Sequence, residues 1–203
     1  PSPERAMTTS QTSLRREAED PQVRQYLEEI EALRLDARSL AEDLSHDQFN
    51  WRPDGKRWSI GQCLEHLTLT VKLYPSRIER MIAEARERQA RGERAWREGW
   101  FTRWFVNSME PPPKLRSRTF GKVEPPSTLE REAVLRAFDA AHGQLADLVR
   151  QADGVSLVHG RTASPFLSIL HFTLNQTIAL NLAHGRRHLW QARQVRGSAG
   201  FPG

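Results

Sequence analysis

Apolar residues recur at steps of three and four along residues 21–44. They are Val23, Tyr26, Leu27, Ile30, Leu33, Ala37, Leu40, Ala41 and Leu44. This spacing places them on one face of a helix and leaves the opposite face polar. We therefore expect an amphipathic helix over this stretch. Residues 1–20 show no sustained period and are expected to form a flexible arm, and residues 50–55 are rich in turn formers and predict a loop.

A second helix is predicted to begin at Ser59, because Gln62 follows three positions later in the pattern of a capping box. Its apolar stripe comprises Ile60, Cys63, Leu64, Leu67, Val71, Tyr74, Ile78, Met81 and Ile82. Pro75 falls inside this run and removes one backbone hydrogen bond, so a kink is expected there. The stripe dissolves into charged residues over 86–97.

Residues 92–126 form a long connection rich in tryptophan and proline. Trp96, Trp100 and Trp104 recur every four residues and predict one short amphipathic helix. Prolines at 111–113 and 125–126 bracket an irregular stretch. A connection of this length suggests either a functional lid or a crossover between helices.

Two further helices are predicted in the C-terminal half. Ser127 and Glu130 have the spacing of another capping box, and the apolar stripe that follows ends near Gly154. Ser164 and Pro165 are suited to the N-cap and first position of the last helix. Apolar residues of every orientation over 166–183 indicate a buried helix.

The prediction is an all-α protein, a four-helix bundle whose long connection joins helices two and three. The bundle is expected to be a single domain spanning residues 21–195, and residues 196–203 are expected to form a flexible tail. No strand is predicted.

Composition narrows the function classes. The chain has 203 residues, 38% hydrophobic, one cysteine and a net charge of +5. It has no disulfide framework, no membrane-spanning run and no apolar signal-peptide core, so a cytoplasmic protein is expected. The excess arginine is interleaved with acidic residues, which is typical of a solvated helix surface. We therefore expect neither nucleic-acid nor membrane binding.

His184 and His188 lie four residues apart on the predicted last helix, so both imidazoles leave the same face. Asn181, Thr177 and Thr173 continue this polar seam, which is either the solvent side of the helix or the lining of a polar cleft. The H-x-x-x-H pattern alone is a weak signal.

Among the other histidines, His66 lies at the edge of the core stripe of helix two. Antiparallel packing could bring it beside the end of helix four. Three histidines would then form a three-nitrogen site with an open position, which is typical of a catalytic ion. His46 and His159 are expected in exposed loops, His142 at a partly covered surface, and His171 on the far side of helix four.

Trp58-Ser59-Ile60 leading into Glu65-His66-Leu67, the Asn50-Trp51-Arg52-Pro53 loop and His184-Gly-Arg-Arg-His188 resemble motifs of the DinB-like superfamily of metalloenzymes. The resemblance covers roughly residues 20–195. It implies a four-helix bundle that binds nickel or zinc through His66, His184 and His188. It also implies a homodimer. The long insert at 92–126 departs from the family pattern.

Activities in that family, as the resemblance implies them, include thiol S-transfer with bacillithiol, mycothiol-dependent isomerisation and metal-dependent hydrolysis. A small-molecule substrate and a low-molecular-weight thiol are therefore expected partners. An ion on three neutral imidazoles would acidify a bound water or thiol, which suits either a hydrolase or a thiol transferase. Zinc and nickel both accept imidazole ligands. The alternative is a non-catalytic bundle that binds a protein partner through residues 92–126.

The sequence identifies no general base. Glu65 adjoins His66 but points about 100° away from it. Cys63 belongs to the core stripe and is expected to be a small buried hydrophobe. Arg186 and Arg187 are candidates for contact with an anionic substrate, although their side chains diverge.

Overall fold

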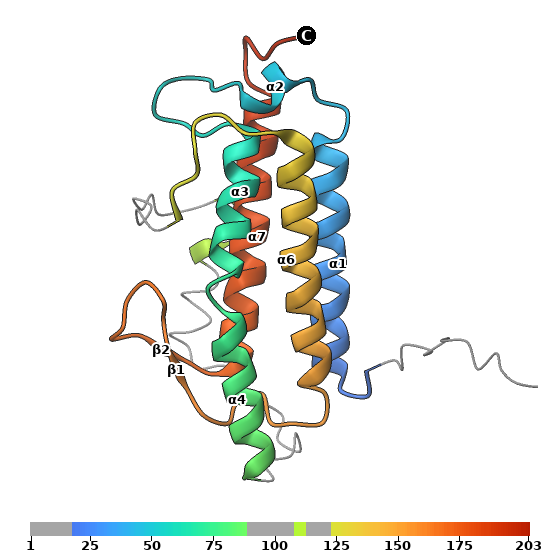
Figure 1. The fold of residues 1–203 in the computed structure, drawn as a ribbon, viewed down its shortest axis with the longest axis vertical. Coiled ribbons are helices and arrows are strands. Elements are labelled where there is room, and N and C mark those ends of the chain that lie inside the picture. The colour runs from blue at the N-terminus through green and yellow to red at the C-terminus, as the bar shows by residue number, and fades with distance from the viewer. Residues whose placement is uncertain (1–17, 89–107, 113–122) are drawn as a thin grey trace, which may run out of the picture.

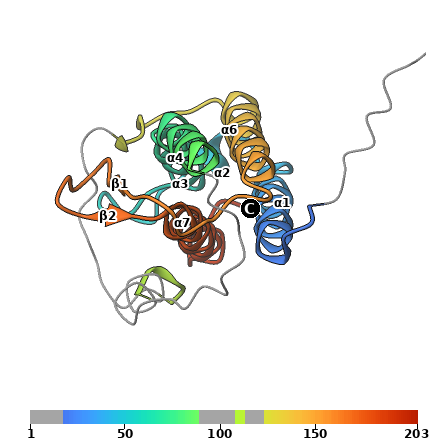
Figure 2. The same cartoon turned by 90° about the horizontal axis from the view of Figure 1, so that it is seen from below.

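The computed structural model describes residues 18–88, 108–112 and 123–203. Four parallel or antiparallel helical columns form the molecule, seen side-on in Figure 1 and end-on in Figure 2. They are α1 (Pro21–Ala41), α3 (Ile60–Val71) continued by α4 (Pro75–Glu87), α6 (Arg131–Gln151) and α7 (Leu174–Arg196). The prediction of an all-α four-helix bundle is confirmed.

The chain runs upward in α1, downward through α3 and α4, downward again in α6 and upward in α7 (Figure 1). Two consecutive columns in the same direction require a connection that returns along the bundle. Residues 88–130 make that connection, so its length follows from the topology. The helix predicted from Trp96, Trp100 and Trp104 lies outside the described residues, which within this connection are 108–112 and 123–130.

The helix starts follow local hydrogen-bonding chemistry. Asp20 caps α1 by accepting from the amides of Gln22 and Val23. Ser59 and Gln62 form the predicted capping box at the start of α3. The capping box predicted from Ser127 is wrong, because α6 begins after Glu130 without a side-chain cap. One short helix, α2 (His46–Asn50), carries its own capping box just before the predicted loop 50–55, so His46 begins a helix rather than lying in a loop as predicted.

Pro75 does not kink a continuous helix as predicted. Helix α3 ends at Val71, and Pro75 begins α4 as its first residue. Proline is favoured at this position because its missing N–H would have no partner within the helix. The column therefore consists of two helices, and its apolar stripe continues across the break through Ile78, Met81 and Ile82, all buried.

The last helix begins nine residues later than predicted, at Leu174 rather than Pro165. Ser164 does accept hydrogen bonds from the amides of Phe166 and Leu167, but these close only a turn. Residues 162–172 form a small antiparallel hairpin of β1 (Thr162–Ala163) and β2 (His171–Phe172), which contradicts the prediction of no strand.

The apolar residues of the hairpin tip are not buried, since Ile169 is 84% exposed. The apolar residues over 166–183 leave no polar face and so show no helical period. Their pattern therefore could not show where the helix begins. The Thr173–Gln176 capping box sets that start.

The core lies between the four columns and is filled by apolar side chains from each. Its fully buried members include Ile30 of α1, Leu64 of α3, Phe138 of α6, and Ile178 and Leu182 of α7. None of the described helices is long and apolar enough to cross a membrane.

The C-terminal tail lies against the region of α2. The ring of Phe201 meets that of Trp51 edge-on at 5.5 Å, and Gln48 donates to the carbonyl oxygen of Pro202. Residues 1–17 of the expected N-terminal arm lie outside the described residues.

Candidate metal centre

Three histidine rings from two helices meet at one side of the bundle. His66 comes from α3, and His184 and His188 come from successive turns of α7. One ring nitrogen from each lies within 4.8 Å of the other two. The ring centroids are 4.5–5.1 Å apart. The polar seam on α7 therefore faces a neighbouring helix at these positions, and the cleft alternative describes it better than the solvent-side one.

His66 is held in one tautomer by the main chain. Its Nδ1 lies 2.8 Å from the carbonyl oxygen of Val123, which can only accept, so Nδ1 carries the proton and donates it. The lone pair of the neutral ring is then on Nε2, which points at His184. Such a backbone partner on the remote nitrogen is typical of a metal-binding histidine.

His188 is the less exposed of the two α7 histidines and is covered by an indole. The Trp58 ring stacks on it at a centroid distance of 5.7 Å and an interplanar angle of 29°. Trp58 also contacts His66, with ring centroids 4.8 Å apart. The Nδ1 atom of His188 is buried and has no hydrogen-bond partner in the part of the chain that the structure describes. This nitrogen is therefore available to a ligand.

Burial keeps all three imidazoles neutral. Loss of solvation lowers the pKa of His66, and the hydrogen bond to Val123 only partly opposes it. Burial also lowers the pKa values of His184 and His188, and repulsion from neighbouring imidazolium and from Arg187 lowers them further. Neutral imidazole is the form that ligates a metal.

The donor set fits a divalent ion. The Nε2 atoms of His66 and His184 are 3.3 Å apart. Two nitrogens that each lie about 2.0–2.1 Å from a tetrahedral ion are separated by about 3.3 Å, so this pair already has the spacing of one edge of such a site. His184 is half-buried, whereas His66 and His188 are buried, so His184 is the most exposed of the three.

The remaining histidines lie elsewhere. His142 was predicted at a partly covered surface, and this is wrong. It is 2% exposed, stacks on Phe138 and donates from Nδ1 to the Phe138 carbonyl. The spacing of apolar residues along α6 identifies one buried face. It could not show that the helix packs against both α1 and α3, so that His142 at the edge of that face is covered as well. His171 lies in β2 and is exposed, rather than on helix four as predicted.

Other candidate groups do not join the centre. Cys63 is fully buried, and burial raises the pKa of its thiol, so it is an inert core residue as predicted. Glu65 is half-buried, and loss of solvation raises the pKa of its carboxyl, but it is not part of the histidine cluster. Arg186 binds Glu29 and Glu110, which leaves it engaged with acidic residues of this chain.

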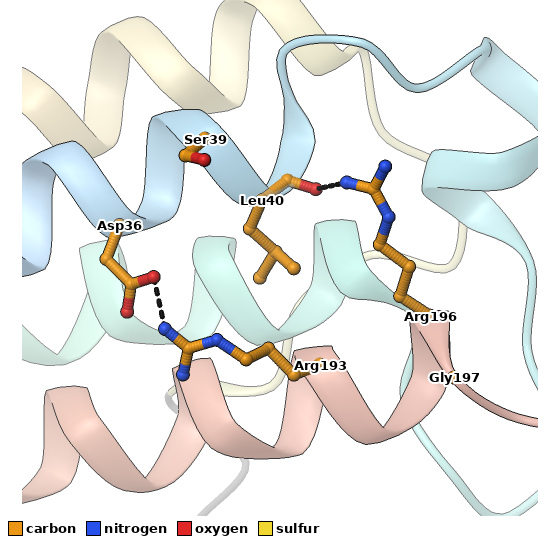
Figure 3. Close-up of a pocket in the computed structure, with 6 residues that line it drawn as sticks. All are labelled: Asp36, Ser39, Leu40, Arg193, Arg196 and Gly197. Atoms are coloured by element: carbon orange, nitrogen blue, oxygen red, sulfur yellow. Dashed lines mark hydrogen bonds and ion pairs between the residues drawn. The ribbon is translucent and has the colours of Figure 1, made fainter.

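A groove between α1 and α7 lies apart from the histidines, toward the C-terminal end of α7 (Figure 3). Two arginines line it. Arg193 pairs with Asp36, and Arg196 donates to the carbonyl of Leu40 and pairs with Asp43. Both guanidinium groups already pair with acidic residues of this chain, whereas the histidine cluster has an unpartnered ring nitrogen, so the cluster is the better candidate site.

Comparison with known proteins agrees with this geometry. The family model of the DinB superfamily matches residues 29–192. The chain belongs to the DinB superfamily. The matched segment contains His66, His184 and His188, so the whole histidine cluster of this DinB-superfamily chain lies inside the region that defines its membership.

Among solved structures, the chain is similar to YfiT from Bacillus subtilis. That protein is described as a probable metal-dependent hydrolase with an unusual four-helix bundle topology. The TM-score is 0.56 at 14% sequence identity, and the alignment covers 96% of this chain and 93% of YfiT. At this identity the likeness establishes a shared fold. No curated protein matches the chain.

Proposed function

We propose that this DinB-superfamily protein is a metal-dependent enzyme whose divalent ion is held by His66, His184 and His188. Hydrolysis and thiol S-transfer are the two reactions that we propose for it. Nickel and zinc are the metals that best suit three imidazole ligands. The substrate is a small molecule, and a low-molecular-weight thiol is the co-substrate in the transferase case.

The observation that carries this proposal is the convergence of three neutral imidazoles from two helices, two buried and one half-buried, without a carboxylate in the cluster among the described residues. The Nε2 atoms of His66 and His184 are 3.3 Å apart, close enough to share a proton or to bind one cation. The description of YfiT as a probable metal-dependent hydrolase supports the same assignment.

The chain's own residues would hold and shape the site. An ion bound by three neutral imidazoles keeps its double charge, and it makes a bound water or thiol more acidic and a better nucleophile near neutral pH. Val123 orients His66 through its carbonyl, and Trp58 covers His66 and His188 on one side. The substrate would approach from the other side, where His184 is half-buried.

Metal content is the direct test. Protein purified without a histidine tag should contain about one nickel or zinc ion per chain by elemental analysis, and His184→Ala should lose it. His171→Ala is the matched control, because this exposed histidine lies outside the cluster and its removal should leave the metal in place. A metal-free wild type, or stoichiometric metal in His184→Ala, would overturn the proposal.

Activity then separates the two reactions. The metal-loaded protein should cleave an activated ester or amide if it is a hydrolase, and should join a thiol to an electrophile if it is a transferase. Chelation should abolish either activity, and added metal should restore it. The family resemblance also predicts a homodimer, which light scattering after gel filtration tests.

A further inference from the structure

Two buried side-chain oxygen atoms, one on α3 and one on α7, have no hydrogen-bond partner in the described part of the chain. They are Oγ1 of Thr70 and Oδ1 of Asn181. Their residues are 3% and 6% exposed, so solvent does not satisfy them from outside. Buried polar atoms without partners are costly and rare, and each one requires an explanation.

Both oxygens belong to the faces that carry the histidine cluster. Thr70 lies one helical turn beyond His66 on α3, and Asn181 lies one turn before His184 on α7. Because α3 and α7 run in opposite directions side by side, these two steps lead the same way along the bundle (Figure 1). At about 1.5 Å per residue they amount to roughly 6 Å and 4.5 Å. Thr70 and Asn181 therefore lie at one level, next to the three rings.

Nearby threonines show that the missing partner is specific to this position. Thr68 of α3 and Thr177 of α7 each donate their hydroxyl to a carbonyl four residues earlier on their own helix, at 3.1 Å and 2.9 Å. Thr70 has the same option and does not use it. Its hydroxyl is instead left available within the interface between the two helices.

The orientation of the Asn181 side-chain amide is fixed by a hydrogen bond from its nitrogen. Its Nδ2 donates to the carbonyl of Thr177 at 2.8 Å, which identifies Oδ1 as the unpartnered atom. A carbonyl oxygen can only accept, so it can be satisfied only by an N–H or O–H group. An ionised carboxylate or phosphate carries no N–H or O–H group, so it would leave Oδ1 unpaired.

We propose that Thr70 and Asn181 form a subsite that binds a hydrogen-bond donor of the ligand held at the histidine cluster, with Asn181 Oδ1 accepting from its N–H or O–H group. This inference rests on the proposed function. It points to substrates that carry an amide or hydroxyl group beside the atom bound at the metal, rather than a second carboxylate or phosphate.

The test uses two small chelators that differ in one hydrogen-bond donor. Acetohydroxamic acid carries an N–H, and N-methylacetohydroxamic acid replaces it with a methyl group. Calorimetric titration of the zinc-loaded full-length protein should show a preference of roughly threefold to tenfold for the first compound, which is the worth of one hydrogen bond. Asn181→Leu should lose this preference and retain zinc.

Thr70→Val provides a second variant of nearly unchanged shape. It should bind acetohydroxamic acid several-fold more weakly, and the ligand-free variant should melt at the same temperature as the wild type or higher, because a buried hydroxyl without a partner has been removed. Thr68→Val is the matched control. It loses a satisfied hydroxyl, so it should be less stable and keep the wild-type preference.

The outcomes separate this inference from the function on which it rests. Zinc bound to the wild type with equal affinity for the two chelators, or an unchanged preference in Asn181→Leu or unchanged affinity in Thr70→Val, overturns the subsite alone. A wild type that retains no metal overturns the proposed function and the subsite together.

Discussion

Gly185 of α7 lies directly against Leu33 of α1. A Cβ atom added to Gly185 would be 2.8 Å from Cδ1 and 3.2 Å from Cδ2 of Leu33, closer than side chains normally approach. Leu33 is 5% exposed, so its neighbours leave it little freedom to move aside. Gly185 also follows His184 directly and precedes His188 by three residues. This contact therefore sets how closely the part of α7 that carries His184 and His188 approaches α1.

Gly185→Ala should destabilise the protein despite the better helix propensity of alanine. Overpacking against Leu33 costs about 1–3 kcal/mol, whereas the propensity gain is about 1 kcal/mol, so a net loss of up to about 2 kcal/mol is expected. Urea unfolding measures it. The shift of α7 should also weaken metal binding, which a metal titration detects.

Two comparisons isolate the contact. A Cβ atom added to Gly143 of α6 would meet nothing within 4 Å, so Gly143→Ala should stabilise the protein by up to about 1 kcal/mol. Leu33→Ala should cost less in the Gly185→Ala background than alone, with a coupling energy of at least about 0.5 kcal/mol, the lower limit for contacting residues. Additive effects would contradict the proposed clash.

The free energy of unfolding of the metal-free protein should decrease as the pH is lowered below about 6.5. An unfolded histidine protonates near that value, whereas burial, aided by Arg34 and opposed by Asp139, lowers the pKa of His142 to about 4. Between these values the unfolded chain binds more protons than the folded one, so stability falls as the pH falls.

From pH 7.5 to 5 the loss assigned to His142 is about 2 kcal/mol. His142→Leu should reduce the pH dependence by that amount in urea titrations at the two pH values. The three cluster histidines act in the same direction, because their pKa values are also lowered. An equally steep dependence in His142→Leu would refute the assignment.

The indole of Trp58 should report on metal binding. It contacts the rings of His66 and His188 at 4.8 Å and 5.7 Å, so a paramagnetic ion such as Ni²⁺ in the cluster should quench its fluorescence. Trp58→Phe should remove most of the quenching and keep the metal. Trp58→Ala should weaken metal binding by about threefold to tenfold, since the stacking contact of about 0.5–1.5 kcal/mol is lost. Trp51→Phe, which alters an indole outside the histidine cluster, is the control.

Arg186 should anchor the described part of the long connection to the bundle. Its Nη1 donates to Oε2 of Glu29 in α1 at 2.6 Å. Its Nε and Nη2 both donate to the carboxylate of Glu110. Arg186→Gln should increase hydrogen exchange at the amides of residues 108–110 and cost roughly 1 kcal/mol of stability. Arg193→Gln is the comparison, because Arg193 is 49% exposed and its single ion pair with Asp36 should contribute less. Unchanged exchange at residues 108–110 in Arg186→Gln would show that this part of the connection is held by other contacts.

Metal should stabilise the folded protein by mass action. At a free zinc concentration of about 100 times the dissociation constant, the free energy of unfolding should rise by about 2.7 kcal/mol. A chelator should reverse the gain in the wild type and leave the melting temperature of His184→Ala unchanged. A melting temperature that is independent of zinc in the wild type would argue against the site.

The periodic parts of this fold were readable from sequence for a physical reason. In α1, α3 and α6 apolar residues alternate with polar ones at the helical period, so each stripe identifies both the helix and the face it buries. The capping box of Ser59 and Gln62 is local chemistry and could be predicted in the same way. Where the pattern carries no period, as over 164–173, the prediction failed and a hairpin was missed.

The sequence by itself determined the helical class, the number of columns, and the placement of His184 and His188 on one face, because these depend on residues within a turn of each other. Only the tertiary structure decided that α3 and α7 lie side by side, which brings His66 to that pair. It also decided that Val123 orients His66 and that Gly185 meets Leu33. Those contacts join residues far apart in the chain, and no local pattern records which helix will face which.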